Sequence, residues 1–193
     1  MAFNKKIEDI DVTNYAECYI LARDIKTPPD VLDLLSKNDN EYIRAYVAQN
    51  SNTSVETLET LSHNRSQIRN IVAANKSTPI KVLLELTQDS VNSVRRSIAQ
   101  NPNITSEILN ILACDTDFYV RSGVAGNNNT SLETLEKLSK DEDDYVREEV
   151  ALNLKTPTEI LEKLLKDKNP YVRSGAKDNL KLTQKEKNNA INN

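Results

Sequence analysis

The sequence predicts an all-α protein, an α-solenoid of six tandem two-helix repeats of about 26 residues each. Three observations support this prediction. A Val/Ile-Arg pair recurs at a nearly constant interval, an asparagine follows each arginine six residues later, and two columns of leucine keep the same phase. Because so many columns stay in register over most of the chain, they indicate a true repeat rather than chance similarity.

The arginine column defines the period. Its spacings are 25, 26, 26, 26 and 26 residues, through Arg44, Arg69, Arg95, Arg121, Arg147 and Arg173. The asparagine column comprises Asn50, Asn75, Asn101, Asn127, Asn153 and Asn179. These columns divide the chain into repeats 27–52, 53–77, 78–103, 104–129, 130–155 and 156–181. Residues 1–26 are expected to form a degenerate capping segment, and residues 182–193 a polar tail that frays.

The first helix of each repeat, called helix A, is expected to begin at a threonine that acts as N-cap. The cap column is Thr27, Thr53, Thr78, Thr130 and Thr156, with Ile104-Thr105 in the fourth repeat. Proline follows at Pro28, Pro79 and Pro157, which suits the first helical position. Acids three residues after the cap predict a capping box, at Asp30, Glu56, Glu133 and Glu159. Leucines three apart, such as Leu32 and Leu35, then share the buried face.

The second helix, called helix B, follows a polar turn. Ile43, Val47 and Asn50 lie at positions i, i+4 and i+7, which predicts one buried helical face. Helices of about ten residues are not stable alone in water, so neighbouring repeats must stack to bury their apolar faces.

Composition excludes several classes of protein. The net charge is −4 and hydrophobic residues make up 38% of the chain, without an apolar run long enough to span a membrane. The charged start lacks a signal-peptide core, so we expect a cytoplasmic protein. Two cysteines, Cys18 and Cys114, are too few for a disulfide framework, and no basic neighbour in sequence favours a reactive thiol.

The unit Thr-Pro-x-x-x-Leu-x-x-Leu, followed by a polar turn and Val-Arg-x-x-Val-Ala-x-Asn, resembles the leucine-rich repeat variant family, a compact relative of HEAT repeats. The resemblance covers residues 27–181. It implies short alternating helices, partly 3₁₀, stacked into a right-handed superhelix. It also implies an N-terminal iron–sulfur cluster in founding-type members, but only Cys18 lies there, so we expect no cofactor. HEAT-like folds include alkylation-repair DNA glycosylases, which are similar to this chain only in helix stacking.

The arginine column has two interpretations, an anion-binding stripe or a structural ladder. Aspartates lie six residues before four of the arginines, at Asp89, Asp115, Asp141 and Asp167, and Asn38 takes this place in the first repeat. HEAT-like repeats pair such residues, so we predict that the aspartates lie within hydrogen-bonding range of arginines in the same repeat or the next. The asparagines are expected to bind loop backbone at a helix end, where asparagine tolerates a left-handed conformation.

Candidate catalytic and metal-binding residues are few. The acidic run Asp141-Glu142-Asp143-Asp144 lacks the glycine and the final acid of an EF-hand loop, so no metal site is predicted. The single histidine, His63, lies in a turn without a nucleophile nearby in sequence. The sequence therefore predicts a protein that is not an enzyme.

Tyrosines and glycines of helix B carry the functional prediction. The tyrosine column is consistent with packing or with a contact surface, and the helical glycines with drift or with close approach of a ligand. If helix B lines the concave side of the stack, the candidate partner-binding residues are Tyr42, Tyr46, Arg96, Tyr119, Ser122, Gly123, Gly126, Tyr145, Glu148, Glu149 and Tyr171. The repeat 130–155 carries four Lys or Arg against eight Asp or Glu, which favours a basic partner.

We therefore expect a non-catalytic scaffold that binds a protein or peptide partner, one with exposed Lys or Arg, through a groove centred on the fourth and fifth repeats. The alternative is a HEAT-like nucleic-acid-binding or DNA-repair protein. Net negative charge argues against that alternative, because phosphate contacts dominate nucleic-acid affinity.

Overall fold

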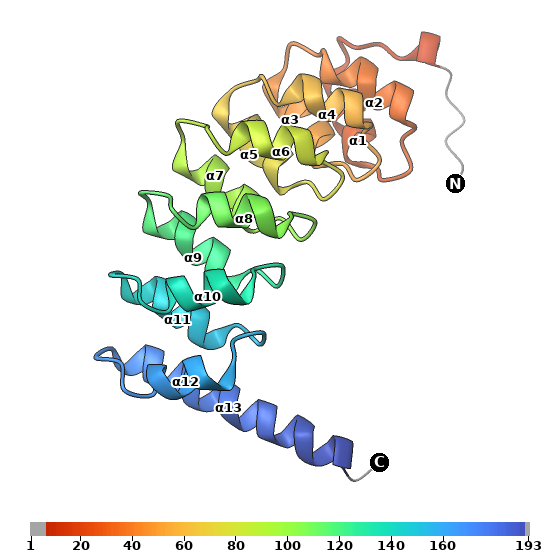
Figure 1. The fold of residues 1–193 in the computed structure, drawn as a ribbon. Helices are drawn as coiled ribbons and strands as arrows, with labels where there is room; N and C mark the ends of the chain where they lie inside the picture. The colour runs from red at the N-terminus through yellow and green to blue at the C-terminus, as the bar shows by residue number, and fades with distance from the viewer. Residues whose placement is uncertain (1–6, 192–193) are drawn as a thin grey trace. The chain divides into compact units, whose positions relative to one another are not determined.

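The computed structural model describes residues 7–191, with side chains through residue 185. In this part of the chain the regular structure consists of 13 α-helices and one 3₁₀ turn, η1 (Ile7–Asp9), with no strand. Figure 1 shows the helices following one another as stacked pairs. The predicted all-α repeat fold is confirmed.

Helices A and B alternate along the chain. Helix A of the six repeats is α2 (Pro29–Ser36), α4 (Val55–Leu61), α6 (Ile80–Leu86), α8 (Ser106–Leu112), α10 (Leu132–Leu138) and α12 (Thr158–Leu164). Helix B is α3 (Glu41–Gln49), α5 (Ser66–Ala74), α7 (Asn92–Ala99), α9 (Phe118–Gly126), α11 (Asp144–Leu152) and α13 (Pro170–Ile191), preceded by α1 (Tyr15–Arg23) from the capping segment. The implied 3₁₀ character is wrong for these helices, which are all α-helical.

The chain divides into two compact units, Met1–Asn103 and Ile104–Asn193, called here the N-terminal and C-terminal units. Within the N-terminal unit, α1, α3, α5 and α7 pack side by side. Within the C-terminal unit, α9, α11 and α13 do the same. Each helix A packs against the helix B of its own repeat. Neighbouring helices B therefore form a continuous layer in each unit.

The core of each unit consists of the predicted columns. The first leucine column is fully buried, with 0% exposure at Leu32, Leu58, Leu83, Leu109, Leu135 and Leu161. In helix B, Ile43 and Val47 are 1% and 0% exposed, and Asn50 is 5% exposed, as their i, i+4, i+7 spacing predicts. Burial of a side chain of this size stabilises the fold by about 2 kcal/mol, which is how stacking makes such short helices stable.

The threonine column has a different role from the one predicted. The N-caps lie one residue later, at Pro28, Ser54, Pro79, Thr105, Ser131 and Pro157. The threonine hydroxyl instead donates to the carbonyl six residues earlier, as from Thr53 to Val47 at 2.5 Å and from Thr156 to Val150 at 2.6 Å. It thus caps the end of the preceding helix B. The acids fall at N2 rather than N3, so they favour the helix dipole without forming the predicted capping box.

The asparagine column joins consecutive repeats. Asn75 Nδ2 donates to the carbonyls of Ala48 and Asn50, at 2.7 and 3.1 Å, and its Oδ1 accepts from the Ser77 N–H at 2.8 Å. The predicted bonds to backbone are therefore confirmed. The left-handed conformation that asparagine tolerates is not used, because the described residues include no positive φ outside glycine and Asn75 is extended at φ −70°.

The C-terminal region is helical rather than frayed, because α13 continues without a break to Ile191. In the other repeats the Asn Oδ1 accepts an N–H that is freed when helix B ends. In α13 the helix does not end at that position, and Asn179 Oδ1 has no partner. Residues 1–6 and 192–193, parts of the predicted capping segment and tail, lie outside the described residues.

Candidate functional site

The arginine column forms a ladder between repeats. Arg121 binds the Asp141 carboxylate with Nε and Nη2, at 2.7 and 2.8 Å, while its Nη1 donates to the Asp115 carbonyl at 2.9 Å. Arg147 binds Asp167 in the same way, at 2.7 and 3.0 Å. Arg69 and Asp89 form the matching rung in the N-terminal unit. The predicted aspartate–arginine contacts are confirmed for Asp89, Asp141 and Asp167, but each carboxylate binds the arginine of the preceding repeat rather than one in the same repeat or the next. The arginine of the same repeat binds only the backbone carbonyl, as Arg121 binds that of Asp115.

Each arginine–aspartate pair, called here a rung of the ladder, lowers the pKa of its aspartate carboxyl group. Hydrogen bonds from Arg69 and Arg147 lower the pKa of Asp89 and Asp167, respectively. Burial acts most strongly on Asp141 and would raise its pKa, but the bonds from Arg121 and from the Asp143 N–H together lower it. The arginines of these rungs are therefore engaged within the fold, which removes them from an anion-binding stripe.

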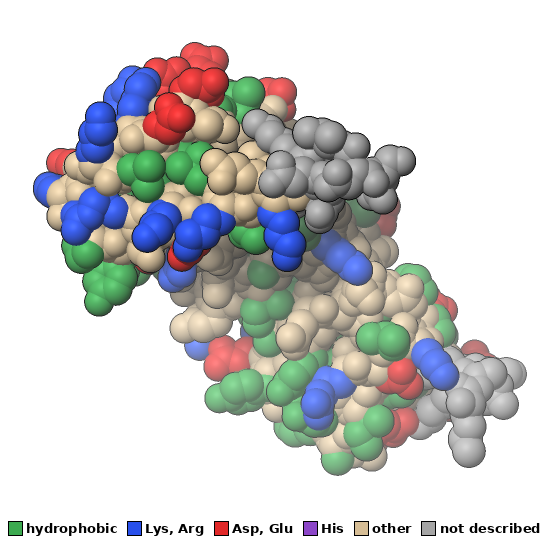
Figure 2. All heavy atoms as spheres, turned by 90° about the horizontal axis from the view of Figure 1, so that it is seen from below, with side chains coloured by type: hydrophobic (Ala, Val, Ile, Leu, Met, Phe, Trp, Pro, Cys, Tyr) green, Lys and Arg blue, Asp and Glu red, His purple; other side chains and the backbone are tan. Residues whose placement is uncertain are grey.

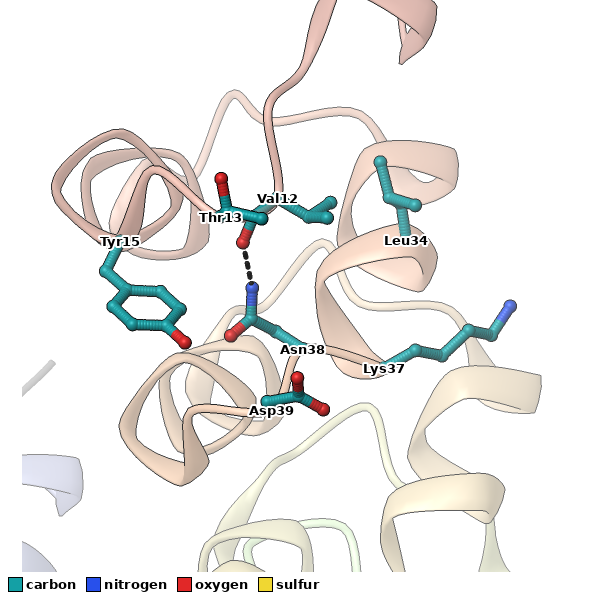
Figure 3. A pocket seen from close by; sticks show the side chains of 7 residues that line it. All are labelled: Val12, Thr13, Tyr15, Leu34, Lys37, Asn38 and Asp39. Carbon is teal, nitrogen blue, oxygen red and sulfur yellow. Dashed lines mark hydrogen bonds between the residues drawn. The ribbon is translucent and has the colours of Figure 1, made fainter.

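The N-terminal end of the ladder is weaker. Asn64 stands where other repeats have aspartate, and Arg44 Nη2 reaches its Oδ1 at only 3.5 Å. Arg44 Nε is buried without a hydrogen-bond partner in the described structure. One repeat earlier, Asn38 donates to the Val12 carbonyl at 2.8 Å, and Figure 3 shows this bond on the wall of a hollow of about 170 Å³. The Asn38 amide in this hollow is thus used for packing.

The candidate site lies in the C-terminal unit, where helices α11 and α13 begin. An open groove of about 470 Å³ is lined there by Asp144, Tyr145, Glu148, Asn169 and Tyr171. Three of these residues, Tyr145, Glu148 and Tyr171, belong to the predicted partner-binding set. The 26-residue period places the two tyrosines at equivalent positions of adjacent helices, so they face the same space.

Local structure orients these side chains. Asp143 and Asn169 are the N-caps of α11 and α13, and their side chains accept from the N–H groups of Tyr145 and Tyr171, at 2.9 and 2.8 Å. Asn169 also donates to Asp144, which ties the two helix starts together. Asp144 and Asn169 were missed as site residues, although their places beside the tyrosine column were a usable signal.

Three groups in the groove remain available to a ligand. Tyr145 is 61% exposed and Tyr171 is 69% exposed. In the described structure, neither phenol group nor the half-buried Glu148 carboxylate forms a hydrogen bond or ion pair. The groove thus combines two exposed aromatic rings with an unpaired carboxylate.

Other predicted contact residues are engaged or hidden. Gly123 is buried in α9, so its predicted place on an accessible floor is wrong. Ser122 donates to the Tyr119 carbonyl within its own helix, at 3.1 Å. Tyr119 is 49% exposed and its ring lies 4.0 Å from that of Phe118, which is itself 6.1 Å from the ring of Tyr145. An aromatic surface therefore adjoins the groove on its α9 side.

Neighbouring helices approach the two glycines Gly126 and Gly175. Gly126 is exposed, and a Cβ there would come within 2.8 Å of the carboxylate at the end of the flexible Glu149 side chain. A Cβ on Gly175 would meet Ala151 and Leu152 at 3.3 Å. Close packing between helices B thus explains Gly175 without a ligand, whereas the Glu149 side chain can move aside from a Cβ at Gly126.

The remaining predicted residues, Tyr42, Tyr46 and Arg96, lie in the N-terminal unit. Tyr42 is 69% exposed. Tyr46 packs edge-on against Tyr19 at 4.9 Å, and Arg23 lies over both rings at 5.0 and 5.3 Å. Tyr46 is therefore part of a local aromatic cluster with Tyr19 and Arg23, and the structure does not bring it into the α11–α13 groove.

Of converging metal ligands, a membrane-spanning helix and a thiol with a basic neighbour, the described residues provide only the thiol. In the described residues, no three His, Cys, Asp or Glu side chains converge as metal ligands do, and no helix has the length and apolarity to cross a bilayer. Cys114 is exposed, and Lys137 of the next repeat donates to its Sγ at 2.9 Å. The sequence expectation of no basic neighbour is thus wrong in space, since Lys137 lies 23 residues away along the chain.

Comparison with known proteins gives a likeness in structure alone. No protein-family profile matches the chain, and no curated protein matches its sequence. A solved leucine-rich repeat variant, described as having a novel repetitive structural motif, matches with a TM-score of 0.64 and 21% identity over 90% of this chain and 73% of that one. A designed armadillo repeat protein in complex with a (KR)4 peptide matches with a TM-score of 0.36 and 14% identity, over 91% and 95% of the two chains. An engineered protein matches with a TM-score of 0.38 and 19% identity, over 91% of this chain and 93% of that one.

The fold and the ladder define the chain as a helical repeat protein. Its fold is that of the leucine-rich repeat variant, as the repeat motif predicted.

Proposed function

We propose that this chain is a non-catalytic scaffold that binds a protein or peptide partner with exposed basic residues, in the groove between α11 and α13. One observation carries the proposal: two exposed tyrosines and the unpaired Glu148 carboxylate line the same 470 Å³ groove. Tyrosine supplies rigid contact area at low entropic cost and is enriched at interfaces.

The chemistry of the groove favours a cation. A Lys or Arg head group between the tyrosines gains from their ring faces and from the Glu148 carboxylate. Asp144 adds a second negative charge, although its hydrogen bond to Asn169 holds it in place. The repeat that contributes α11 carries a net charge of −4, from four basic and eight acidic residues, which attracts a basic partner before contact.

The test uses peptide arrays and fluorescence anisotropy with the full chain. Peptides with one or two Lys or Arg residues beside an apolar residue are expected to bind better than neutral or acidic peptides. Glu148→Gln and Tyr145→Ala should each weaken binding by about tenfold, which corresponds to about 1.4 kcal/mol. Equal binding of acidic and basic peptides would contradict the proposal.

Two control variants separate the groove from general charge and surface effects. Glu162→Gln removes an exposed carboxylate from α12, outside the groove, and Tyr42→Ala removes an exposed tyrosine from the N-terminal unit. Both should leave affinity nearly unchanged. Basic-peptide binding that falls equally in Glu148→Gln and Glu162→Gln would indicate attraction by net charge rather than by this groove.

A nucleic-acid-binding function is the competing proposal and has less support. The chain is acidic overall, and arginines of the described rungs are occupied by aspartates. A salt-sensitive gel shift at low-micromolar protein that is abolished by Arg96→Glu would favour it instead.

A further inference from the structure

The last arginine of the ladder, Arg173 in α13, differs from the arginines before it. Its Nη1 donates to the carbonyls of Asp167 and Lys168, at 2.7 and 2.9 Å. Arg147 makes the same two contacts one repeat earlier, with Asp141 and Glu142 at 2.8 and 3.1 Å. The backbone of its own repeat therefore holds each guanidinium by the same nitrogen.

The other edge of the guanidinium distinguishes the two arginines. Nε and Nη2 of Arg147 bind the Asp167 carboxylate, and the side chain is only 7% exposed. In the described structure, Nε and Nη2 of Arg173 have no partner. Arg173 thus exposes the Nε and Nη2 edge of its guanidinium, called here the fork. Its Nη1 contacts hold the guanidinium as the same contacts hold that of Arg147. Planar forks of this kind match a carboxylate with two parallel hydrogen bonds.

Lys177 shows which occupant this end of the C-terminal unit accepts. It lies one turn after Arg173, in the column where Ala125 and Ala151 are 0% exposed because another helix B covers them. Packing a further helix B on α13 would bury the Lys177 ammonium, which is costly without a paired charge. A second copy of the repeat is therefore disfavoured here, whereas an acidic group gains from both cations.

From these observations we infer that the exposed end of α13 is a second binding site, which takes an aspartate carboxylate from an acidic segment of a partner. The carboxylate occupies Nε and Nη2 of Arg173 as Asp167 occupies those of Arg147, and Lys177 adds a favourable charge. In the internal rungs the aspartate also accepts the N–H two residues ahead, as from Asn169 to Asp167 at 2.8 Å. The fitting segment therefore presents its aspartate at a turn.

Figure 2, seen from below and so from the side of α13, shows blue Lys and Arg side chains on the near part of the surface, with red Asp and Glu side chains along one edge of it. Exposed cations of this region include Lys166, Lys168, Arg173, Lys177 and Lys181. Lys181 is paired with Asp178 at 2.8 Å, so its charge is partly offset. The surroundings of Arg173 are thus basic, opposite in sign to the α11–α13 groove, and the two sites select opposite ligand charges.

The test follows the arginine Nε–Hε signals of the ¹⁵N-labelled full chain by NMR. The probe is a capped peptide with the sequence of residues 138–145, whose Asp141 is the carboxylate that fills the Arg121 rung. The Arg173 signal is expected to shift and saturate on titration. The same peptide with Asp141→Asn should bind at least about fivefold more weakly, because it loses the charged bidentate acceptor.

Substitutions distinguish bidentate binding by the Arg173 guanidinium from attraction by positive charge alone. Arg173→Lys keeps the charge but loses the fork, and should weaken binding by about fivefold or more. Lys177→Glu, at an exposed position, should also weaken binding without lowering the melting temperature. Arg96→Lys is the matched control in the N-terminal unit and should have no effect. An unmoved Arg173 signal at millimolar peptide, full binding by Arg173→Lys, or an equal shift with a single-stranded oligonucleotide would each overturn the inference.

Discussion

At the scale of single residues, the asparagine column bonds differently in the repeats and in the capping segment. Asn153 donates to the carbonyls of Ala125 and Asn127, at 2.7 and 3.1 Å. Asp24 occupies the same column in the capping segment. There the side chain needs only to accept, and its Oδ1 takes the Lys26 N–H at 2.9 Å.

This contrast predicts the order of two substitutions. Asn153→Ala leaves the buried Ala125 carbonyl without this donor, while the Asn127 carbonyl keeps the Thr130 N–H at 3.1 Å, and should cost about 2 kcal/mol. Asn153→Asp should cost more still, since it places a carboxylate against the same carbonyls. Asp24→Asn is the control and should stay within about 0.5 kcal/mol. Urea unfolding measures all three, and an aspartate at position 153 that is tolerated better than alanine would contradict this account.

The weak Arg44 rung predicts a stabilising change. Asn64→Asp provides the carboxylate that later repeats use, so the buried Arg44 Nε gains a partner in place of the 3.5 Å contact between Nη2 and the amide. Stability should rise by about 1 kcal/mol, visible as a higher melting temperature. Asp89→Asn makes the reverse change in the next repeat and should lower it. A melting temperature that falls with Asn64→Asp would show that the shortened turn cannot form the rung.

At the scale of elements, the rungs link helix B of one repeat to the turn before helix B of the next. The pKa values of Asp89, Asp141 and Asp167 are lowered from an ordinary value of 3.8 in the folded chain. The folded state therefore favours the ionised carboxylates more than the unfolded state does. This contribution is complete above the ordinary value and is lost as the pH falls through the lowered folded values.

We expect Asp167→Asn to change this acid dependence. At neutral pH the variant should be less stable than the natural chain, because Arg147 loses its charged partner. The difference should shrink as the pH falls below about 4, where the natural carboxylate also becomes neutral. Free energies of unfolding measured in urea over a pH series test this expectation. A difference that is constant with pH would mean that the rung's charge does not contribute.

At the scale of the whole molecule, repeats contact mainly their neighbours, so stability is expected to be local. Leu135→Ala removes a fully buried side chain from α10, at a cost of about 3 kcal/mol. Hydrogen exchange should then speed up in α9 to α12 more than in α1 to α5. Leu58→Ala, in the same column of the N-terminal unit, should give the reverse pattern. Equal loss of protection throughout would show one cooperative unit instead.

The sequence by itself determined the repeat, the helices and the buried columns. Leu32, Val47 and Asn50 are buried as their spacing predicts, because the side chains that share a helix face depend only on local geometry. Tyr145, Glu148 and Tyr171 were also identifiable, since exposed positions of helix B follow from the same period.

Only the tertiary structure decided which groups meet between repeats. It paired Asp167 with Arg147 rather than Arg173, and placed the Thr53 hydroxyl on the end of the preceding helix. It also buried Gly123 and brought Asn169 to Asp144. Such contacts depend on the distance and orientation of neighbouring helices, which the spacing of residues along one helix does not specify.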